Sequence, residues 1–422
     1  MAGWTGVLGI EKERHAFESL SRNLIYGSVG YKYEWPNWLP KRNLTVGTFA
    51  RKYRKQILTL RGKVDLLIGG PPCQGFSMAG KRKKDDPRNL MFRHYIQIVS
   101  LIRPKLVVLE NVRGIDIQFE KRSRNKPKRH SKPFSYRIIR ALENIGYLTT
   151  AGDVCATNFG VPQNRTRYFI FGFDRQALGS IDPNLFNQDG QLSPFKLLNS
   201  SRIDFLKAKN LPSSRPVTVQ EALSDLATAG RKRIECVDSP GFFQLVYTKP
   251  RSSYQRLLHG DLNGVTPNSM RLVNHRQDTV ERFEMILRTC RKGVLLSQHD
   301  RDRLGLKKHA TVPLAAHKPS HTLTTLPDDI LHYSEPRILT VRESARLQSF
   351  PDKFEFKGKY TTGGKKRVKE CPRYTQVGNA VPPLVAEIIG LVLLRILFEI
   401  HPTRKSSSAR RSCNAQAKKP KS

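Results

Sequence analysis

Residues 64–77 read Val-Asp-Leu-Leu-Ile-Gly-Gly-Pro-Pro-Cys-Gln-Gly-Phe-Ser, an apolar run followed by a turn rich in glycine and proline. The apolar part predicts a short buried strand, and Gly-Gly-Pro-Pro ends that strand abruptly. The sequence therefore places Cys73 on a stiff turn at the carboxyl edge of a sheet, where open α/β folds bind their ligands. A thiolate is a strong nucleophile, so Cys73 is a candidate for covalent chemistry; the alternative is a cysteine packed in a loop.

Apolar runs of strand length alternate with helical patterns on both sides of this turn. The strand-like runs are residues 7–10, 64–68, 106–109 and 168–172, and the helical patterns cover 13–24, 90–102 and 136–145. This alternation predicts βαβ units and a parallel sheet. The regularity fades between about 174 and 336, which predicts a second, irregular domain inserted into the first. A short strand and helix over 337–350 and a closing helix over 385–399 follow.

The composition indicates a globular protein with a polyanionic partner. Lysine and arginine number 74 against 35 acidic residues, a formal net charge of +39, while 38% of the residues are hydrophobic. Nucleic acid is the first candidate for the partner, and an anionic membrane surface is the second. The six cysteines include no C-x-x-C pair, so we expect neither a metal site nor disulfides, and a reducing cytoplasm fits.

Two further patterns bear on the compartment. The N-terminus lacks the features of a secretion signal. Glu387 and Arg395 interrupt the most apolar stretch, residues 384–400, so we expect a buried or amphipathic helix there rather than a membrane span.

Four segments after the cysteine turn complete an ordered series of motifs. They are Glu110-Asn-Val, Gln163-Asn-Arg-Thr-Arg167, residues 337–351 and Gly378-Asn-Ala-Val-Pro-Pro383. Together with residues 70–77, this series resembles the cytosine-5 DNA methyltransferase family, and packing alone does not explain five such segments in one order. The resemblance covers residues 1–175 and 336–400 and is loose between them.

The resemblance implies an α/β fold with a defined domain order. The fold is the S-adenosylmethionine-dependent methyltransferase Rossmann-like sheet, N-terminally truncated, with an inserted smaller target-recognition domain. We expect the catalytic domain in two parts, 1–175 and 336–401, the target-recognition domain over 176–335, and a basic disordered tail over 402–422.

The chemistry of the family agrees with these residue types. Carbon 5 of cytosine is too electron-poor to attack a methyl donor unaided, but addition of the Cys73 thiolate to carbon 6 produces an enamine with a nucleophilic carbon 5. Glu110 ends an apolar strand, where burial raises a carboxyl pKa, and is suited to donate a proton or hydrogen bond to N3. Its alternative role is to cap the next helix.

The two arginines of the segment 163–167 are the remaining catalytic candidates. Arg165 and Arg167 lie two residues apart before a strand and so point to the same side. One is expected to hold Glu110 or the cytosine carbonyl, and the other a flanking phosphate. Asn111 resembles a residue that braces the cysteine loop through hydrogen bonds to its backbone.

For the cofactor, S-adenosyl-L-methionine, the resemblance implies contacts from six residues. Glu11 matches an acid that binds ribose hydroxyls, and the other matching positions are Gly70, Pro72, Leu90, Asn379 and Val381. The family's opening strand and Phe-x-Gly-x-Gly loop, which cradle the methionine part, are missing here. We therefore predict poor cofactor binding and weak or no activity for the chain as given. A missing N-terminal segment, encoded upstream or supplied by a separate polypeptide, is one candidate partner.

The substrate implied is double-stranded DNA with its target base flipped out. The basic loop 81–88 is expected to close over it, and residues 270–277 and 301–309 are candidates for reading sequence in the major groove. We expect a monomer, cytoplasmic and nucleoid-associated through DNA, that belongs to a restriction–modification system with a cognate restriction endonuclease. Two alternatives are an RNA cytosine-5 methyltransferase and a catalytically impaired DNA-binding remnant.

Overall fold

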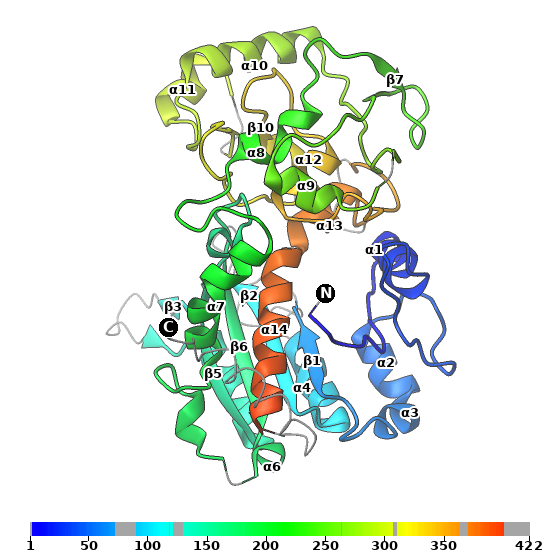
Figure 1. Ribbon diagram of the computed structural model, residues 1–422, viewed down its shortest axis with the longest axis vertical. Coiled ribbons are helices and arrows are strands. Elements are labelled where there is room, and N and C mark those ends of the chain that lie inside the picture. Colours follow the sequence, from blue (N-terminus) through cyan, green and yellow to red (C-terminus); the bar gives the residue numbers. More distant parts are fainter. Residues whose placement is uncertain are drawn as a thin grey trace, which may run out of the picture.

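The computed structural model describes residues 2–71, 90–117, 119–120, 130–179, 181–262, 264–306, 310–362 and 370–400. The molecule has two parts stacked one above the other (Figure 1). The lower part contains the main sheet and its helices, and the upper part is built from short helices and strands. Cys73, Pro72 and the basic loop 81–88 lie outside the described residues.

Within the described part of the chain, the main sheet has four strands in the order β1-β2-β6-β5. Their bounds are Leu66–Gly69 for β1, Leu106–Val112 for β2, Tyr147–Cys155 for β5 and Thr166–Asp174 for β6. β1 and β2 are parallel, but β6 runs antiparallel to both β2 and β5. The prediction of a wholly parallel sheet is therefore wrong. A short connection, residues 156–165, joins β5 to β6, and parallel strands need a longer crossover.

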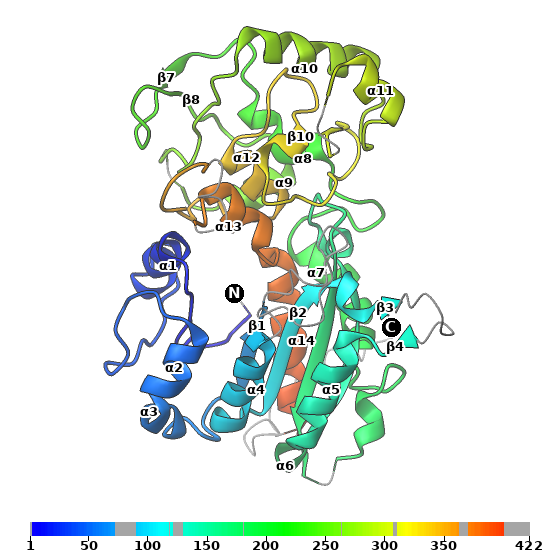
Figure 2. The ribbon, with the colours of Figure 1, turned by 180° about the vertical axis from the view of Figure 1, so that it is seen from behind.

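Both faces of this sheet are buried under helices, as the α/β prediction requires. One face packs on α7 (Pro194–Ala208) and α14 (Pro383–Ile400), and the other on α4 (Leu90–Ile102) and α5 (Phe134–Asn144). Figure 2 shows α4 and α5 in front of the strands, with α14 behind them. Alternate residues of β2 and β6 supply the two cores: Leu106, Val108, Phe169, Phe171 and Phe173 on the α14 side, and Val107, Leu109, Tyr168 and Ile170 on the α4 side.

The N-terminal residues form a separate layer beside β1. This layer contains α1 (Arg14–Leu20), α2 (Val46–Lys52) and α3 (Arg54–Leu58), and a third hydrophobic core joins it to α4. The strand predicted over residues 7–10 is extended chain without a ladder. The nearby Gly6 carbonyl instead accepts a hydrogen bond from the Glu34 amide at 2.8 Å. Among the described residues β1 therefore pairs only with β2, and its Ile68 is 64% exposed.

The helix predictions are confirmed, with small shifts at the ends. Residues 13–24 form α1 and a following π-helical turn, 90–102 form α4, 136–145 lie within and just beyond α5, and 385–399 lie within α14. By length and composition alone, the run Arg373–Ile400 could cross a membrane, but half of its most apolar window is buried. The buried side chains of α14 belong to the main core, which confirms the prediction of a core helix there.

The remaining elements are short. The helices are α6 (Arg175–Leu178), α8 (Val219–Leu223), α9 (Ser253–His259), α10 (Gln277–Thr289), α11 (Gln298–Arg303), α12 (Val341–Leu347) and α13 (Arg373–Asn379). The described residues also form three pairs of strands: β3 (Phe119–Glu120) with β4 (His130–Ser131), β7 (Arg233–Glu235) with β8 (Phe243–Leu245), and β9 (Val312–Pro313) with β10 (Ile330–Leu331).

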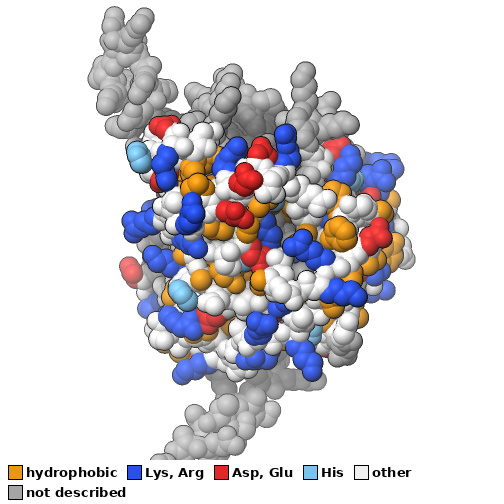
Figure 3. Space-filling view, turned by 90° about the horizontal axis from the view of Figure 1, so that it is seen from above, with side chains coloured by type: hydrophobic (Ala, Val, Ile, Leu, Met, Phe, Trp, Pro, Cys, Tyr) orange, Lys and Arg blue, Asp and Glu red, His pale blue; other side chains and the backbone are white. Residues whose placement is uncertain are grey.

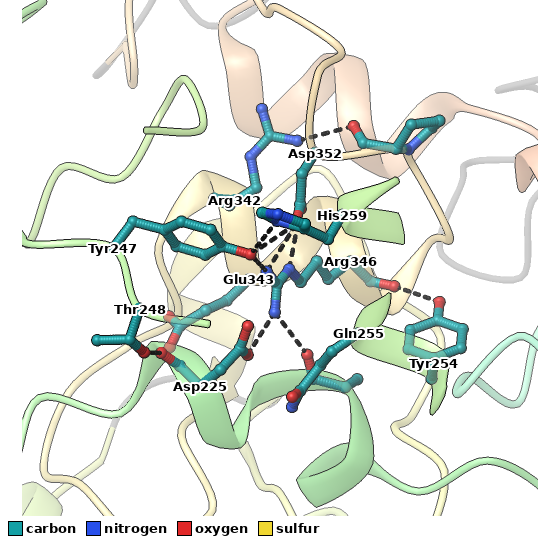
Figure 4. A network of polar contacts seen from close by, with 12 residues as sticks. Asp225, Tyr247, Thr248, Tyr254, Gln255, His259, Arg342, Glu343, Arg346 and Asp352 are labelled. Carbon is teal, nitrogen blue, oxygen red and sulfur yellow. Dashed lines mark hydrogen bonds and ion pairs between the residues drawn. The ribbon is translucent and has the colours of Figure 1, made fainter. Parts of the chain in front are cut away.

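A buried polar network ties α12 to the rest of the upper part (Figure 4). The Arg346 guanidinium forms ion pairs with Asp225 and, at 2.7 Å, with Asp352, and all three side chains are fully buried. Tyr247 lies beside them, and its hydroxyl accepts a hydrogen bond from Arg346 at 2.9 Å and contacts His259 Nδ1 at 2.8 Å. The network therefore joins segments that are distant in sequence.

Candidate active site

The backbone at the end of β1 lies against Glu110 and Asn111 of β2. A Cβ atom added at Gly70 would lie 3.3 Å from Glu110 Oε2, so any larger residue would crowd the carboxylate. Asn111 is buried, and its Nδ2 donates a hydrogen bond to the Pro71 carbonyl at 3.2 Å. Asn111 Oδ1 accepts from the Val112 amide at 2.7 Å. Asn111 thus holds the backbone of Pro71, which precedes Cys73 by two residues in the sequence.

Glu110 and Arg167 form an ion pair at this edge. Arg167 Nε lies 3.1 Å from Glu110 Oε1, and the two side chains are 15% and 14% exposed, respectively. The pairing follows from the register of β2 and β6, in which Val112 stands opposite Arg167. Burial raises the pKa of Glu110, although Arg167 and Arg165 act to lower it. A carboxyl with a raised pKa is suited to donate a proton.

Arg165 lies in a different environment from Arg167. It is buried, and its guanidinium donates hydrogen bonds to the carbonyls of Leu323 at 3.3 Å, Gly378 at 2.9 Å and Ala380 at 3.1 Å. Burial, followed by the charge of Arg167, lowers the pKa of Arg165 to about 9. Through these bonds the covered guanidinium of Arg165 binds the backbone at the α13–α14 junction. Of the two arginines, Arg167 is the one that holds Glu110.

Two buried glutamines belong to the same framework, although the sequence alone suggested no role for either. Gln163 Nε2 donates to the Leu347 carbonyl at 3.1 Å and to Gln348 Oε1 at 3.0 Å. Gln348 Nε2 in turn donates to the Val377 carbonyl at 2.9 Å. These bonds fix α12 and α13 against the start of β6. The available signal was their place inside two of the five motifs.

The predicted cofactor residues are only partly brought together. Glu11 is half-buried, its Oε1 accepts from the Glu13 amide at 2.8 Å, and burial raises the pKa of Glu11. Asn379 is exposed at the end of α13, and the half-buried Val381 packs on the main core. Pro72 and the side chain of Leu90 lie outside the described residues, and Gly70 lies beside Glu110.

Helix α13 is also bound directly to the layer that carries Glu11. Ser19 Oγ of α1 donates to Gln376 Oε1 of α13 at 2.6 Å, and Ser19 Oγ accepts from the Lys357 amide at 2.8 Å. The buried Asn23 donates to the Glu355 carbonyl at 2.8 Å. Glu11 and Asn379 therefore belong to one connected unit.

The two segments predicted to read DNA differ in exposure. Met270 and Leu272 are buried in a small core, so these residues of the 270–277 segment do not reach a groove. Asn274 and Arg276 of the same segment are both exposed. Of the basic run 301–309, residues 301–303 belong to the exposed α11, and 307–309 lie outside the described residues.

Comparison with known proteins gives one consistent result. A family model described as C-5 cytosine-specific DNA methylase matches residues 9–395. The chain is similar to the type II methyltransferase M.DdeI of Desulfomicrobium norvegicum, with 30% identity over 92% of this chain and 83% of the relative. M.Bpa9945I of Bacillus paralicheniformis is also 30% identical, over 80% of this chain and 72% of that protein.

A solved structure supports the fold. A prophage-encoded protein of E. coli, described as a putative DNA modification methyltransferase, superimposes with a TM-score of 0.60 at 22% identity and covers 94% of both chains.

Proposed function

The chain belongs to the C-5 cytosine-specific DNA methylase family, and we propose that it methylates a flipped cytosine through a covalent bond to Cys73. The family assignment makes the protein a DNA (cytosine-5-)-methyltransferase with S-adenosyl-L-methionine as methyl donor. The observation that carries the proposal is the Glu110–Arg167 pair beside Gly70, which precedes Cys73 by three positions in the sequence.

In the proposed reaction, Sγ of Cys73 bonds to carbon 6 of the cytosine. The electrons of the 5,6 double bond move to carbon 5, which takes the methyl group. Glu110 donates a hydrogen bond or a proton to N3 and so relieves the negative charge that develops on the ring. Arg167 keeps the carboxyl in place. Loss of the proton from carbon 5 then restores the double bond and releases the Cys73 thiolate.

The donor site fits its ligand only in part. Glu11 offers a half-buried carboxylate of the kind that accepts hydrogen bonds from ribose hydroxyls, and the exposed Asn379 lies on the unit bound to it. The methyl donor, when bound, supplies an electrophilic methyl group on a sulfonium. The sequence contains no Phe-x-Gly-x-Gly motif for the methionine part. Among the described strands, β1 lies at the edge of the sheet, and the family's opening strand is expected beside it. We therefore expect weak donor binding by these 422 residues.

A trapping experiment tests the covalent step. DNA with 5-fluorocytosine in place of cytosine has no proton to lose at carbon 5, so the enzyme and the methylated base stay joined. With donor present, we expect an adduct that resists denaturation for the parent chain and none for Cys73→Ser. Cys155→Ser, at a half-buried cysteine of β5, is the matched control and keeps the adduct. DNA binding without any adduct would favour the alternative of an impaired DNA-binding remnant.

We propose residues 176–335 as the target-recognition domain. Its first long helix, α7, packs on α14 of the lower part, and the elements from α8 to β10 lie above. Figure 3 shows Lys and Arg side chains spread over this upper face, interleaved with apolar ones. Asn274 and Arg276 are accessible side chains suited to base edges or phosphates.

Sequencing after bisulfite treatment tests the recognition proposal. DNA from a host without cytosine methylation that expresses the protein gives the recognised sequence. We expect Asn274→Ala with Arg276→Ala to lower methylation at that sequence. Methylation at every cytosine context by the parent chain, with no site preference, would contradict a recognition domain.

The cellular setting belongs to the same proposal. The named relatives are type II methyltransferases, which supports a restriction–modification system with a cognate endonuclease. Because the substrate is chromosomal DNA, we propose a cytoplasmic monomer that associates with the nucleoid. Light scattering on the purified protein tests the monomer, and a dimer mass would contradict it.

A further inference from the structure

A cation-rich surface lies on the N-terminal layer, apart from the proposed catalytic edge. Residues 35–64 contain eight basic residues and no acidic one. These eight are Lys41, Arg42, Arg51, Lys52, Arg54, Lys55, Arg61 and Lys63, and all are exposed. We call these eight side chains the α2–α3 cationic surface. Figure 1 places α2 and α3 beside α4 and the lower half of the sheet, whereas α8 to α11 lie at the opposite end of the molecule.

This surface is built on a packed core, so its charges are held in place. Phe49 of α2 and Tyr53, which lies between α2 and α3, pack with Ile98 and Ile102 of α4 in one buried core. Four of the cations, at positions 51, 52, 54 and 55, flank the buried Tyr53 in the sequence. Like charges this close on a folded surface repel one another and reduce stability. A solvated face without a partner gains nothing from such an arrangement.

Few contacts within the described residues stabilise these eight cations. Arg61 Nη1 donates to the carbonyls of Ser100 and Leu101 at 2.7 and 3.2 Å. These carbonyls lie in the last turn of α4, where a cation stabilises the helix by interacting with its dipole. Lys41 and Lys52 lie 5.5 and 5.7 Å from tyrosine ring centroids. Within the part of the chain that the structure describes, no carboxylate forms an ion pair with any of the eight. Among the described residues, this surface therefore carries positive charge that no carboxylate pairs with.

We infer that the α2–α3 cationic surface binds the phosphate backbone of duplex DNA outside the target site, without regard to sequence. The inference depends on DNA being the substrate of the family, but not on the covalent role of Cys73. Lysine and arginine side chains on a fixed surface displace the counterions of DNA, and this displacement drives non-specific binding. Such binding retains the enzyme on DNA between target sites.

The test compares two variants of the full chain with equal net charge. The first carries Arg51→Gln, Lys52→Gln, Arg54→Gln and Lys55→Gln. The matched control replaces four exposed cations outside residues 176–335 that have no ion pair among the described residues: Lys132→Gln, Arg137→Gln, Arg175→Gln and Arg395→Gln. Both variants lose the same charge, so only a local interaction with DNA distinguishes them. Unchanged melting temperatures confirm folding.

Fluorescence anisotropy gives the affinity for a random duplex of about 40 base pairs between about 50 and 200 mM salt. For the α2–α3 variant we expect the slope of log K against log salt to be shallower by roughly 2 to 4, about 0.9 for each phosphate that the variant leaves without a cation. The control should keep the parent slope. Equal slopes in the two variants would overturn the inference, whether both fall together or neither changes.

Two further measurements separate this inference from other outcomes. If the α2–α3 variant keeps the DNA slope but loses binding to phosphatidylserine vesicles, the partner is a membrane surface and the inference is wrong. The 5-fluorocytosine adduct on a short duplex, formed with donor present, reports on the covalent step and not on the α2–α3 cationic surface. A failed adduct with a shifted salt slope would contradict the covalent proposal and support this one.

Discussion

The carboxyl of Glu110 keeps a raised pKa although Arg167 lies 3.1 Å away, because burial outweighs the attraction of the cation. The Arg167 side chain is itself only 15% exposed. Arg165, two residues earlier, engages three backbone carbonyls instead. Two arginines of one motif thus make different contacts: Arg167 pairs with a carboxylate side chain, and Arg165 binds backbone carbonyls.

We expect Glu110→Gln to lower the rate of methyl transfer by about 10²- to 10⁴-fold, because the amide has no acidic proton for N3. DNA binding should stay unchanged, which an anisotropy titration checks. Glu143→Gln, at a partly exposed acid of α5 remote from the pair, is the control and keeps the parent rate. A rate loss smaller than about tenfold would show that Glu110 is not the proton donor.

The raised pKa of Glu110 also predicts a pH dependence of stability. The folded state holds the proton more tightly than the unfolded state, whose carboxyl has the ordinary value of 4.5. This group's contribution is therefore fully present below pH 4.5 and is lost as pH rises through the raised pKa. Urea unfolding at a series of pH values should show this loss in the parent chain and not in Glu110→Gln. The same pH dependence of the unfolding free energy in both proteins would contradict a raised pKa of Glu110.

Arg165→Ala separates a positioning role from a catalytic one. Its loss removes a donor from the carbonyls of Leu323, Gly378 and Ala380, and we expect the free energy of unfolding to fall by about 2–5 kcal/mol. Urea denaturation measures this change. A variant with parental stability but no methyl transfer would show instead that Arg165 acts on the substrate.

Among the helices, α12 is unusual because every one of its side chains is buried, although several are charged. Arg346 pairs with Asp225 and Asp352, and Glu343 accepts two hydrogen bonds from Arg337, each at 2.8 Å. Burial acts to raise the pKa of Glu343, but Arg337 lowers it to about 2. The helix is held by these pairs as well as by its apolar side chains.

Arg346→Met should destabilise the protein by about 3–5 kcal/mol, because two buried carboxylates lose their cation. Adding Asp225→Asn and Asp352→Asn should recover part of the loss, since no buried charge is then left alone. Arg140→Met removes the exposed pair with Glu143 and should cost less than about 1 kcal/mol. Thermal or urea unfolding measures all three, and equal effects of Arg346→Met and Arg140→Met would contradict the network's role.

For the whole molecule, the main consequence concerns the methyl donor. The sheet ends at β1 among the described residues, and the sequence has no glycine loop for the methionine part of the donor. Calorimetry on the 422-residue chain should therefore give a dissociation constant well above the order of 1 μM for S-adenosylmethionine. Binding on the order of 1 μM or tighter would show that other residues replace the loop.

The five motifs, the sheet helices and the closing helix were readable from the chain alone, because strand and helix periodicities and turn residues are local properties. Glu110, Asn111 and the arginines 165 and 167 could be named because the motifs that contain them resemble those of the family. The antiparallel direction of β6, the distinct roles of Arg165 and Arg167, and the burial of Met270 could not. Each depends on which distant segments meet, and a side chain's partners, exposure and pKa exist only once long-range packing has brought those segments together.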